Sequence, residues 1–230
     1  MPEATLAELL ERNARHVDSL SETHFAGVES SQKPAVVSVC CSDSRVSQEG
    51  MWAVDEPGWL FTAGNIGNQV WETRDGERVL SGDVLYPIRY TDTDTAVVVG
   101  HTGCGAVTAA LETVRDGTTE PFPPGIESRI EALRPVIEAG LDDERVSSDG
   151  TANVVNQLVE YNVDRQVEFL RTDGSVPETE TVLGFVYDFQ GAYGDARGRC
   201  YLVNNDGETD LDTLSDAVPQ RFRSHVERLL

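Results

Sequence analysis

Two short runs of β-branched residues constrain the fold of this chain more than any other feature of its sequence. Residues 35–41 read AVVSVCC, and residues 95–100 read TAVVVG. Neither run alternates apolar with polar side chains, and such runs are typical of strands buried on both faces of a parallel sheet. Stretches with helical spacing lie before, between and after them, and this alternation predicts an α/β fold.

The same periodicity predicts the remaining elements. Further strands are expected at 59–62, 181–188 and 199–204, the last two as a hairpin at one edge of the sheet. Helices are expected from about Gly105 onward and at 5–20, 77–90, 126–140, 152–171 and 212–230. The expected architecture is therefore a mostly parallel central sheet flanked by helices, with an antiparallel edge strand near the C-terminus.

No shift in composition divides the chain, so residues 1–230 are expected to form a single domain. The N-terminal helix at 5–20 places its leucines on one face, and this face needs a partner. Residues 116–150 combine a loop rich in Gly and Pro, the expected helix at 126–140 and a polar stretch. We interpret 116–150 as an insertion or a lid rather than as a linker between domains.

A large acidic excess limits the partners of this protein. Forty Asp and Glu residues against eighteen Lys and Arg residues give a formal net charge of −22. This charge argues against nucleic acids and anionic membrane surfaces as partners, because binding to either relies on clustered cations. Lys33 is the only lysine among the cations. We interpret this pattern as halophilic, since a Debye length of about 3 Å in molar salt screens the self-repulsion; the alternative is an ordinary acidic protein.

The sequence also bears on the location of the protein. No stretch approaches the ~20 apolar residues that a membrane span needs. The first residues, MPEATLAELLERN, have neither the basic nor the apolar region of a secretory signal. We therefore expect a cytoplasmic protein, in which clustered Cys and His side chains more often bind metals or act as catalytic thiols than form disulfides.

Two motifs carry the chemistry of the chain, and each directly follows one of the buried runs. CSDSR occupies 41–45, and HTGC occupies 101–104. Because the carboxyl ends of parallel strands meet at one edge of a sheet, we expect Cys41, His101 and Cys104 to converge if the two strands are neighbours. Two thiolates and one imidazole suit Zn²⁺, and three protein ligands leave the fourth position open, as in catalytic zinc sites.

Asp43 and Arg45 extend the first motif. In an extended stretch, Cys41, Asp43 and Arg45 share one side of the chain. Two roles are open for Asp43. It could accept a hydrogen bond from a metal-bound hydroxide while Arg45 orients it, or it could occupy the fourth coordination position and close the site.

The other cysteines and histidines are expected to have structural roles. Strand alternation turns Cys40 away from Cys41, so we expect it to pack in the core. Cys200 lies in an expected strand without a partner motif and is also interpreted as a core residue. The remaining histidines are expected at exposed or capping positions: His16, His24 and His225.

Taken together, these motifs resemble those of the β class of carbonic anhydrases. The family pattern is Cys-x-Asp-x-Arg followed by His-x-x-Cys, and every fixed position is filled here. The flanking sequence is also similar, including AGN at 63–65, GAV at 105–107, and the long segment NVVNQLVEYNVDRQVEFL with the strand VLGFVYD after it. The resemblance therefore spans nearly the whole chain.

The resemblance implies a lyase that hydrates CO₂ reversibly to bicarbonate, with zinc as the cofactor and zinc-bound hydroxide as the nucleophile. It implies Cys41, His101 and Cys104 as the zinc ligands. It also implies Asp43 and Arg45 as the catalytic dyad, with Asp43 as a fourth zinc ligand only in a closed state.

The resemblance further assigns Gly64 and Gly105 to the substrate pocket. It implies a homo-oligomer, a dimer or a tetramer, in which the N-terminal helix packs on a neighbouring subunit. Two alternatives remain open at this point. The same scaffold could hydrolyse COS or CS₂, or the metal could serve a non-catalytic, zinc-binding protein.

Overall fold

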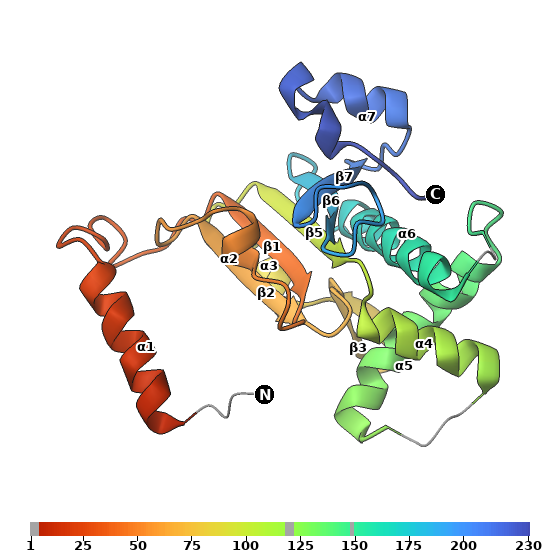
Figure 1. Cartoon of the computed structure of the whole chain (residues 1–230), viewed down its shortest axis with the longest axis horizontal. Helices are drawn as coiled ribbons and strands as arrows, with labels where there is room; N and C mark the ends of the chain where they lie inside the picture. Colours follow the sequence, from red (N-terminus) through yellow and green to blue (C-terminus); the bar gives the residue numbers. More distant parts are fainter. Residues whose placement is uncertain (1–4, 118–121, 148–149) are drawn as a thin grey trace.

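The computed structural model describes residues 5–117, 122–147 and 150–230. A five-stranded sheet with the order β2-β1-β5-β6-β7 forms its centre (Figure 1). The strands are β1 (Val36–Cys41), β2 (Leu60–Asn65), β5 (Thr95–His101), β6 (Thr181–Asp188) and β7 (Arg199–Asn205). Neighbouring strands are parallel from β2 to β6, and β7 is antiparallel to β6. The predicted mostly parallel sheet with an antiparallel edge strand is therefore confirmed.

The two β-branched runs form the middle of the sheet. In the register of β1 and β5, Val39 lies beside Val98, and both side chains are fully buried. Valine suits this position because its branched side chain packs well on a pleated surface that is covered on both faces. The two strands that precede the candidate metal motifs are thus direct neighbours, which meets the condition on which the convergence of the motifs was expected.

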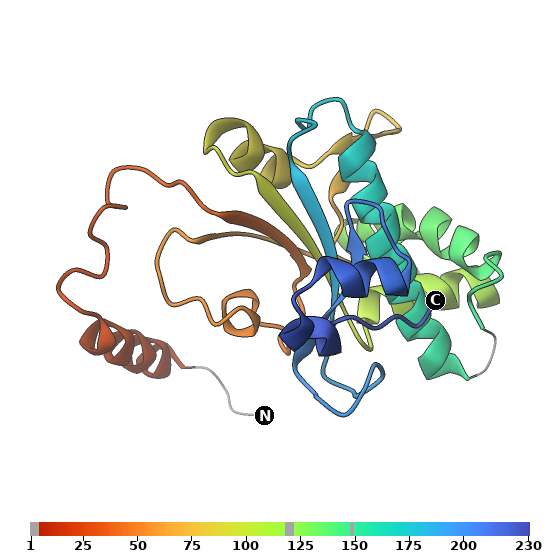
Figure 2. The same ribbon diagram turned by 90° about the horizontal axis from the view of Figure 1, so that it is seen from above.

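Helices cover one face of the sheet and form the main core with it (Figure 2). These helices are α3 (Gly82–Tyr90), α4 (Gly105–Asp116), α5 (Pro124–Leu141) and α6 (Thr151–Thr172). Val37 and Val98 of the sheet share this core with Leu111 of α4, Ile137 of α5 and Leu158 of α6. The opposite face has smaller clusters under α2 (Gln48–Met51) and under α7 (Leu211–Ala217).

The segment 116–150 contributes α5 to the main core. Ile130, Leu133 and Ile137 are buried there, and α5 packs against α4 and α6. Residues 118–121 and 148–149 of this segment lie outside the described part of the chain. Its interpretation as an insertion or a lid stays a prediction.

The expected helix at 77–90 is wrong in its first part. Strand β4 (Glu77–Leu80) pairs with β3 (Trp71–Arg74) in an antiparallel hairpin, and α3 begins only at Gly82. The turn between the strands is Asp75-Gly76, and both residues have positive φ angles, 53° and 84°. An Asp-Gly pair is a strong hairpin signal because a tight turn of this hand needs two left-handed residues. The helical spacing of 77–90 concealed that signal.

The expected helix at 212–230 is also too long. Helix α7 ends at Ala217, and Val218 takes an extended conformation with φ −104° and ψ 147°. Pro219 follows, and a proline disfavours helical geometry in the residue before it. A 3₁₀-helix, η1 (Gln220–His225), comes next, and the chain then runs on without helical structure.

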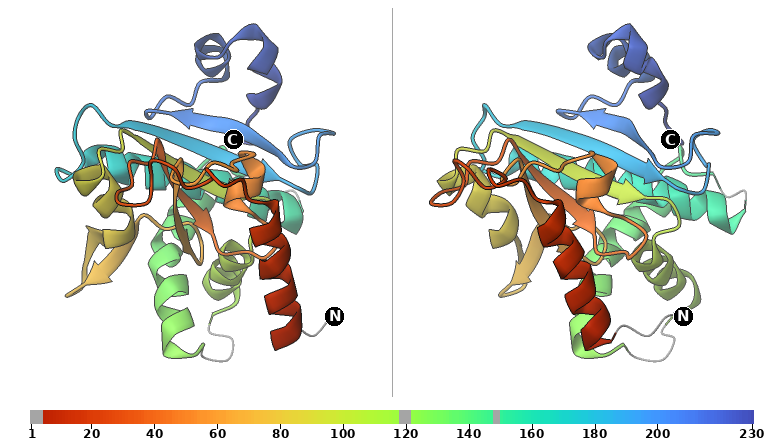
Figure 3. Two further views of the ribbon diagram at one scale, coloured as in Figure 1. Left: turned by 90° about the vertical axis from the view of Figure 1, so that its left-hand side faces the viewer. Right: turned by 60° about the vertical axis from the view of Figure 1, so that its left-hand side comes forward.

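Helix α1 (Leu6–Ser19) stands away from the sheet (Figures 1 and 2), and it lies in front of the other elements when that side of the molecule faces the viewer (Figure 3). Its N-terminus is capped by the Thr5 hydroxyl, which accepts a hydrogen bond from the Glu8 amide at 3.2 Å. None of its residues is buried, and its large apolar side chains are 57–74% exposed: Leu6, Leu9, Leu10 and Val17. The predicted helix is confirmed, and the described residues leave its apolar face largely uncovered. Across the described residues, no helix combines the length and the apolar character that spanning a membrane requires.

Candidate metal centre

Three side chains converge at the carboxyl edge of the sheet. Cys41 is the last residue of β1, His101 is the last residue of β5, and Cys104 caps the N-terminus of α4. Their potential ligand atoms all lie within 4.8 Å of one another, and the two sulfurs are 3.9 Å apart. The convergence that the sequence predicts is therefore observed, and its cause is the direct pairing of β1 with β5.

The turn between His101 and Cys104 depends on Gly103. This glycine has a φ of 64°, and a Cβ atom here would lie 2.4 Å from Nε2 of Gln190. Its amide donates a 2.8 Å hydrogen bond to Oδ1 of Asn156 on α6. The positive φ favours glycine, and a Cβ atom would in addition displace the end of the Gln190 side chain. The turn brings Cys104 back beside the end of β1.

The tautomer of His101 follows from its surroundings. Nδ1 lies 3.0 Å from the carbonyl oxygen of Thr102, and a carbonyl can only accept a hydrogen bond. Nδ1 therefore carries the proton, and Nε2 keeps a free lone pair. The ring is fully buried, and Nε2 has no hydrogen-bond partner among the described residues. A buried acceptor without a partner is costly, and a metal ion would satisfy it.

The two thiols have opposite pKa shifts. A hydrogen bond from Cys104 is the main cause that lowers the pKa of Cys41 to about 4. The same hydrogen bond, followed by burial, raises the pKa of Cys104 well above its usual value. This contact therefore favours a thiolate at Cys41, with Cys104 as the hydrogen-bond donor. Zinc binding requires thiolates, so it would also displace the proton of Cys104.

The donor set fits a zinc ion. Two Zn–S bonds of about 2.3 Å at a tetrahedral angle place the sulfurs about 3.8 Å apart, and the observed separation is 3.9 Å. Both cysteines are free of disulfides, and the third donor is the lone pair of His101. These three residues form the whole ligand group found among the described residues, so a four-coordinate zinc ion held by them would keep one position for another ligand, as in catalytic zinc sites.

Asp43 lies beside the three donors, and Arg45 holds it in place. The guanidinium donates from Nε to Oδ1 at 2.8 Å and from a terminal nitrogen to Oδ2 at 2.6 Å. It also reaches the carbonyl oxygen of Gly103 at 3.3 Å. This pairing holds the pKa of the Asp43 carboxyl well below its usual range. Oδ2 of Asp43 lies 3.7 Å from Nε2 of His101, so an ionised carboxylate faces the same space as the free lone pair.

Sequence reasoning missed Phe189, which follows β6 directly. Its ring stacks on the imidazole of His101, with the centroids 5.8 Å apart and an interplanar angle of 24°. The guanidinium carbon of Arg45 lies 4.6 Å from the centroid of the same ring. One signal could have found it, because Phe189 lies at the carboxyl end of a third parallel strand and therefore at the same edge of the sheet.

The sequence profile of the family described as carbonic anhydrase matches residues 36–193, which include both motifs. The chain belongs to the β class of carbonic anhydrases. One relative is carbonic anhydrase 2 of Mycobacterium tuberculosis, which is 32% identical over 150 residues, or 62% of this chain and 67% of the relative. Another is a carbonic anhydrase of Pseudomonas aeruginosa, 30% identical over 177 residues, or 75% of this chain and 77% of the relative. This membership places the chain among the lyases.

Solved β-carbonic anhydrases share the fold. The enzyme of Coccomyxa, solved in complex with acetazolamide, has a TM-score of 0.72 at 23% identity and covers 93% of this chain and 92% of its own. One of two tetrameric enzymes from Sordaria macrospora has a TM-score of 0.70 at 20% identity, with 87% and 98% covered. These similarities confirm the predicted fold class.

The two glycines that were assigned to the pocket lie beside the motifs of this carbonic anhydrase fold. Gly64 pairs with Cys40 across β1 and β2, and a Cβ atom there would be 3.1 Å from Oγ of Ser42. Gly105 begins α4 immediately after Cys104, and a Cβ atom there would meet nothing within 4 Å. The space next to Gly105 is thus open, and the substrate role of both glycines stays a prediction.

The cysteines outside the metal centre are core residues, as predicted. Cys40 is fully buried on the opposite face of the sheet, where it clusters with Val97 and Val99. Burial, its largest cause, raises the pKa of Cys40 to about 12. Cys200 is also buried, and burial raises its pKa to about 12. Neither thiol is poised for metal binding.

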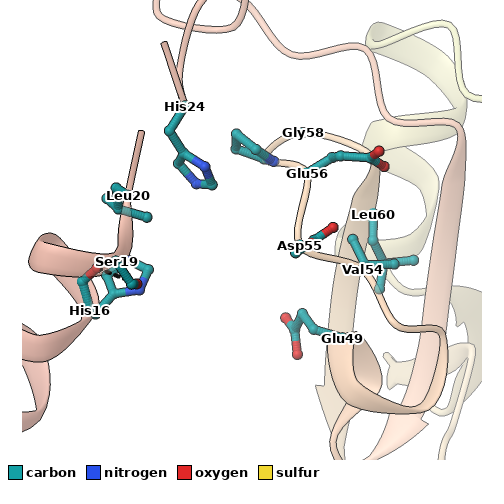
Figure 4. A pocket seen from close by; sticks show the side chains of 11 residues that line it. His16, Ser19, Leu20, His24, Glu49, Val54, Asp55, Glu56, Gly58 and Leu60 are labelled. Atoms are coloured by element: carbon teal, nitrogen blue, oxygen red, sulfur yellow. Dashed lines mark hydrogen bonds between the residues drawn. The ribbon is translucent and has the colours of Figure 1, made fainter. Parts of the chain in front are cut away.

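The remaining histidines lie away from the metal centre. His16 and His24 line a cavity of about 560 Å³ between α1 and the segment from Glu49 to Leu60 (Figure 4). His16 is exposed and His24 is partly exposed. His225 lies at the end of η1, where Nδ1 is 3.1 Å from the carbonyl oxygen of Cys200.

Proposed function

We propose that this carbonic anhydrase catalyses the reversible hydration of CO₂ to bicarbonate, with zinc held by Cys41, His101 and Cys104. One observation carries the proposal: the donor group has three members, and the Asp43 carboxylate lies next to it, with Oδ2 3.7 Å from Nε2 of His101. A metal ion with an open position beside an ionised carboxylate is the arrangement that water activation needs.

When bound, the metal supplies a Lewis acid that brings the pKa of water into the neutral range. Asp43 then acts as a hydrogen-bond acceptor that orients the reacting water through Oδ2. Arg45 keeps this carboxylate ionised and fixes its plane, because the guanidinium engages both oxygens. The same double contact supports a resting state in which Asp43 is not the fourth ligand.

The proposal is tested by stopped-flow hydration of CO₂ with the zinc-loaded protein and with Asp43→Asn. We expect the variant to keep its zinc and to lose about 10- to 100-fold in kcat/KM. A matched control exists in Asp143, which Arg145 holds with the same set of hydrogen bonds in an Asp-x-Arg segment outside the metal centre. Asp143→Asn should leave the rate unchanged.

Three results would contradict the proposal. The first is a zinc-loaded wild-type protein that does not hydrate CO₂ at pH 8.5, which would favour a non-catalytic metal centre. The second is a protein that turns over COS or CS₂ but not CO₂. The third is full activity in Asp43→Asn, which would remove the carboxylate from the mechanism.

We further propose that the protein is a homo-oligomer in which α1 packs on a second copy. Support comes from the exposed apolar face of α1 and from the tetrameric relatives of Sordaria macrospora. Leu9→Asp should lower the mass measured by light scattering to that of a smaller species, whereas the adjacent polar change Glu11→Gln should not. An unchanged mass in Leu9→Asp would exclude α1 from the interface. We also propose that the protein is cytoplasmic.

A further inference from the structure

Asp188 is a fully buried carboxylate at the end of β6, outside the ligand set and the Asp43–Arg45 pair. It receives hydrogen bonds from four neutral donors. Oδ1 accepts from the Thr102 hydroxyl at 3.1 Å and from the amides of Gln190 and Gly191 at 2.9 and 2.8 Å. Oδ2 accepts from the Tyr193 amide at 2.9 Å. Burying a carboxylate is costly, so this number of donors indicates a group that organises its surroundings.

The three amide contacts wrap the loop 189–193 around the carboxylate. Gly191 supports this tight path with a φ of 81°. At the far end of the loop, the Tyr193 hydroxyl donates a 2.7 Å hydrogen bond to Oε2 of Glu160 on α6. The loop is therefore held both at its centre and at its end, which fixes where its first side chain, Phe189, can lie.

Thr102 links this loop to the metal centre. Its hydroxyl donates to Asp188 and accepts a 3.3 Å hydrogen bond from the Phe189 amide. Its carbonyl oxygen accepts the hydrogen bond from Nδ1 of His101, and its amide donates to the carbonyl oxygen of Tyr187 at 3.1 Å. One buried residue thus contacts both the histidine and the loop that carries Phe189.

We propose that Asp188 is a positioning residue of this active site, acting through the Thr102 hydroxyl and the 189–193 loop. It sets Phe189 against the imidazole of His101 on one side and the guanidinium of Arg45 on the other. The Asp188 carboxylate contacts neither the metal ligands nor the Asp43–Arg45 pair. It nevertheless orients one member of each, His101 and Arg45. The inference rests on the proposed function, because it concerns the geometry of the same site.

The decisive variants alter Thr102, since it carries the contact between Asp188 and His101. Thr102→Val keeps the shape and removes the hydroxyl, whereas Thr102→Ser keeps the hydroxyl. Thr113→Val is the matched control, because the Thr113 hydroxyl donates only within α4, to the carbonyl oxygen of Ala109. Asp188→Asn is a second test, in which an amide replaces an acceptor that faces four donors.

Zinc affinity is measured first, by competition with a chelator on the full-length holoprotein, because this readout does not depend on turnover. We expect Thr102→Val and Asp188→Asn to bind zinc about 10- to 100-fold more weakly. Thr102→Ser and Thr113→Val should bind it like the wild type. CO₂ hydration is measured second, with saturating zinc. There, Thr102→Val should lower kcat and leave KM nearly unchanged.

Wild-type zinc affinity and kcat in Thr102→Val would overturn the inference, even if the variant were less stable, because a purely structural hydroxyl would affect only stability. Should Asp188→Asn fail to fold, the Thr102 variants still decide the question. A protein without CO₂ hydration would contradict the proposed function but would leave the zinc-affinity comparison intact, so the two failures can be told apart.

Discussion

The Arg45 side chain donates hydrogen bonds to both carboxylate oxygens of Asp43, and the Arg145 side chain does the same to Asp143. The side-chain distances are 2.8 and 2.6 Å in the first pair and 2.9 and 2.7 Å in the second, and in each pair the arginine amide also donates to Oδ1. This ion pair with two side-chain hydrogen bonds is therefore a local property of an Asp-x-Arg segment. Its place beside Cys41 distinguishes the first pair, and for this pair alone we propose a role in catalysis.

Arg45→Lys should lower kcat/KM for CO₂ by about tenfold while zinc content stays constant. A lysine carries a compact charge and cannot make two parallel hydrogen bonds to one carboxylate. Stopped-flow rates and metal analysis of the same preparation check this. Arg145→Lys provides the control and should match the wild type. Equal rates for the two variants would show that the two hydrogen bonds from Arg45 to Asp43 have no part in catalysis.

Cys41→Ser should lose most of its zinc on dialysis against a weak chelator, because a serine hydroxyl is a poor ligand for zinc at neutral pH. Metal analysis per chain is the measurement. The neighbouring variant Cys40→Ala should keep its zinc, since Cys40 lies on the other face of the sheet. Full zinc content in Cys41→Ser would refute the ligand assignment.

Arg228→Met should destabilise the protein by about 3–5 kcal/mol. The Arg228 side chain is 2% exposed, with Nε 3.1 Å from Oε1 of Glu160 and a terminal nitrogen 2.7 Å from Oδ2 of Asp164. Its removal takes away the cation that pairs with both carboxylates, of which Glu160 is fully buried. Arg223→Met, which breaks an exposed pair with Asp216, should cost less than about 1 kcal/mol. Urea unfolding of both variants measures the difference, and similar losses would argue against a buried network.

Glu180→Gln should stabilise the protein above neutral pH. Burial, and then the charge of Asp94, raises the pKa of Glu180 from 4.5 to about 7. The folded state therefore holds a proton that the unfolded state releases, so the contribution of this group to stability is present below pH 4.5 and is lost as the pH rises to about 7.

The gain in Glu180→Gln at pH 8 should be about 1–2 kcal/mol, with little gain near pH 4.5. Unfolding by urea at the two pH values gives the comparison. Glu178→Gln changes an exposed neighbour and should have no such pH dependence. A gain of equal size at both pH values would contradict the titration of Glu180.

Potassium chloride should stabilise the protein strongly. The net charge of −22 means that the excess carboxylates repel one another in dilute buffer. At about 1 M salt the Debye length falls to about 3 Å, and this repulsion is screened. We expect the unfolding temperature to rise steadily between about 0.1 and 2 M KCl. Glycerol, which does not screen charge, serves as the control. Full stability in dilute buffer would instead support an ordinary acidic protein.

Features that depend on near neighbours in the chain could be predicted from the sequence. The β-branched runs before Cys41 and His101 predict buried parallel strands, and the residues that follow them predict where donors gather. The turn at Asp75-Gly76 is equally local, but the helical spacing of 77–90 conceals the hairpin that it forms. Pro219 likewise could have ended the expected C-terminal helix.

Residues that act across the sheet could not be predicted in the same way. The end of β6 marks the edge of the sheet at which Phe189 lies, but its contact with His101 and the contact of Asp188 with Thr102 depend on the parallel pairing of β5 with β6, which places His101 beside Tyr187. Arg228 meets Glu160 because the C-terminal segment returns to α6. The sequence by itself determined which strands form and which side chains can bind a metal, because both follow from local periodicity and donor chemistry. Only the tertiary structure decided what surrounds those donors, because the order of strands in the sheet sets which distant residues become neighbours. One succession of strands and helices along a sequence is compatible with several such orders.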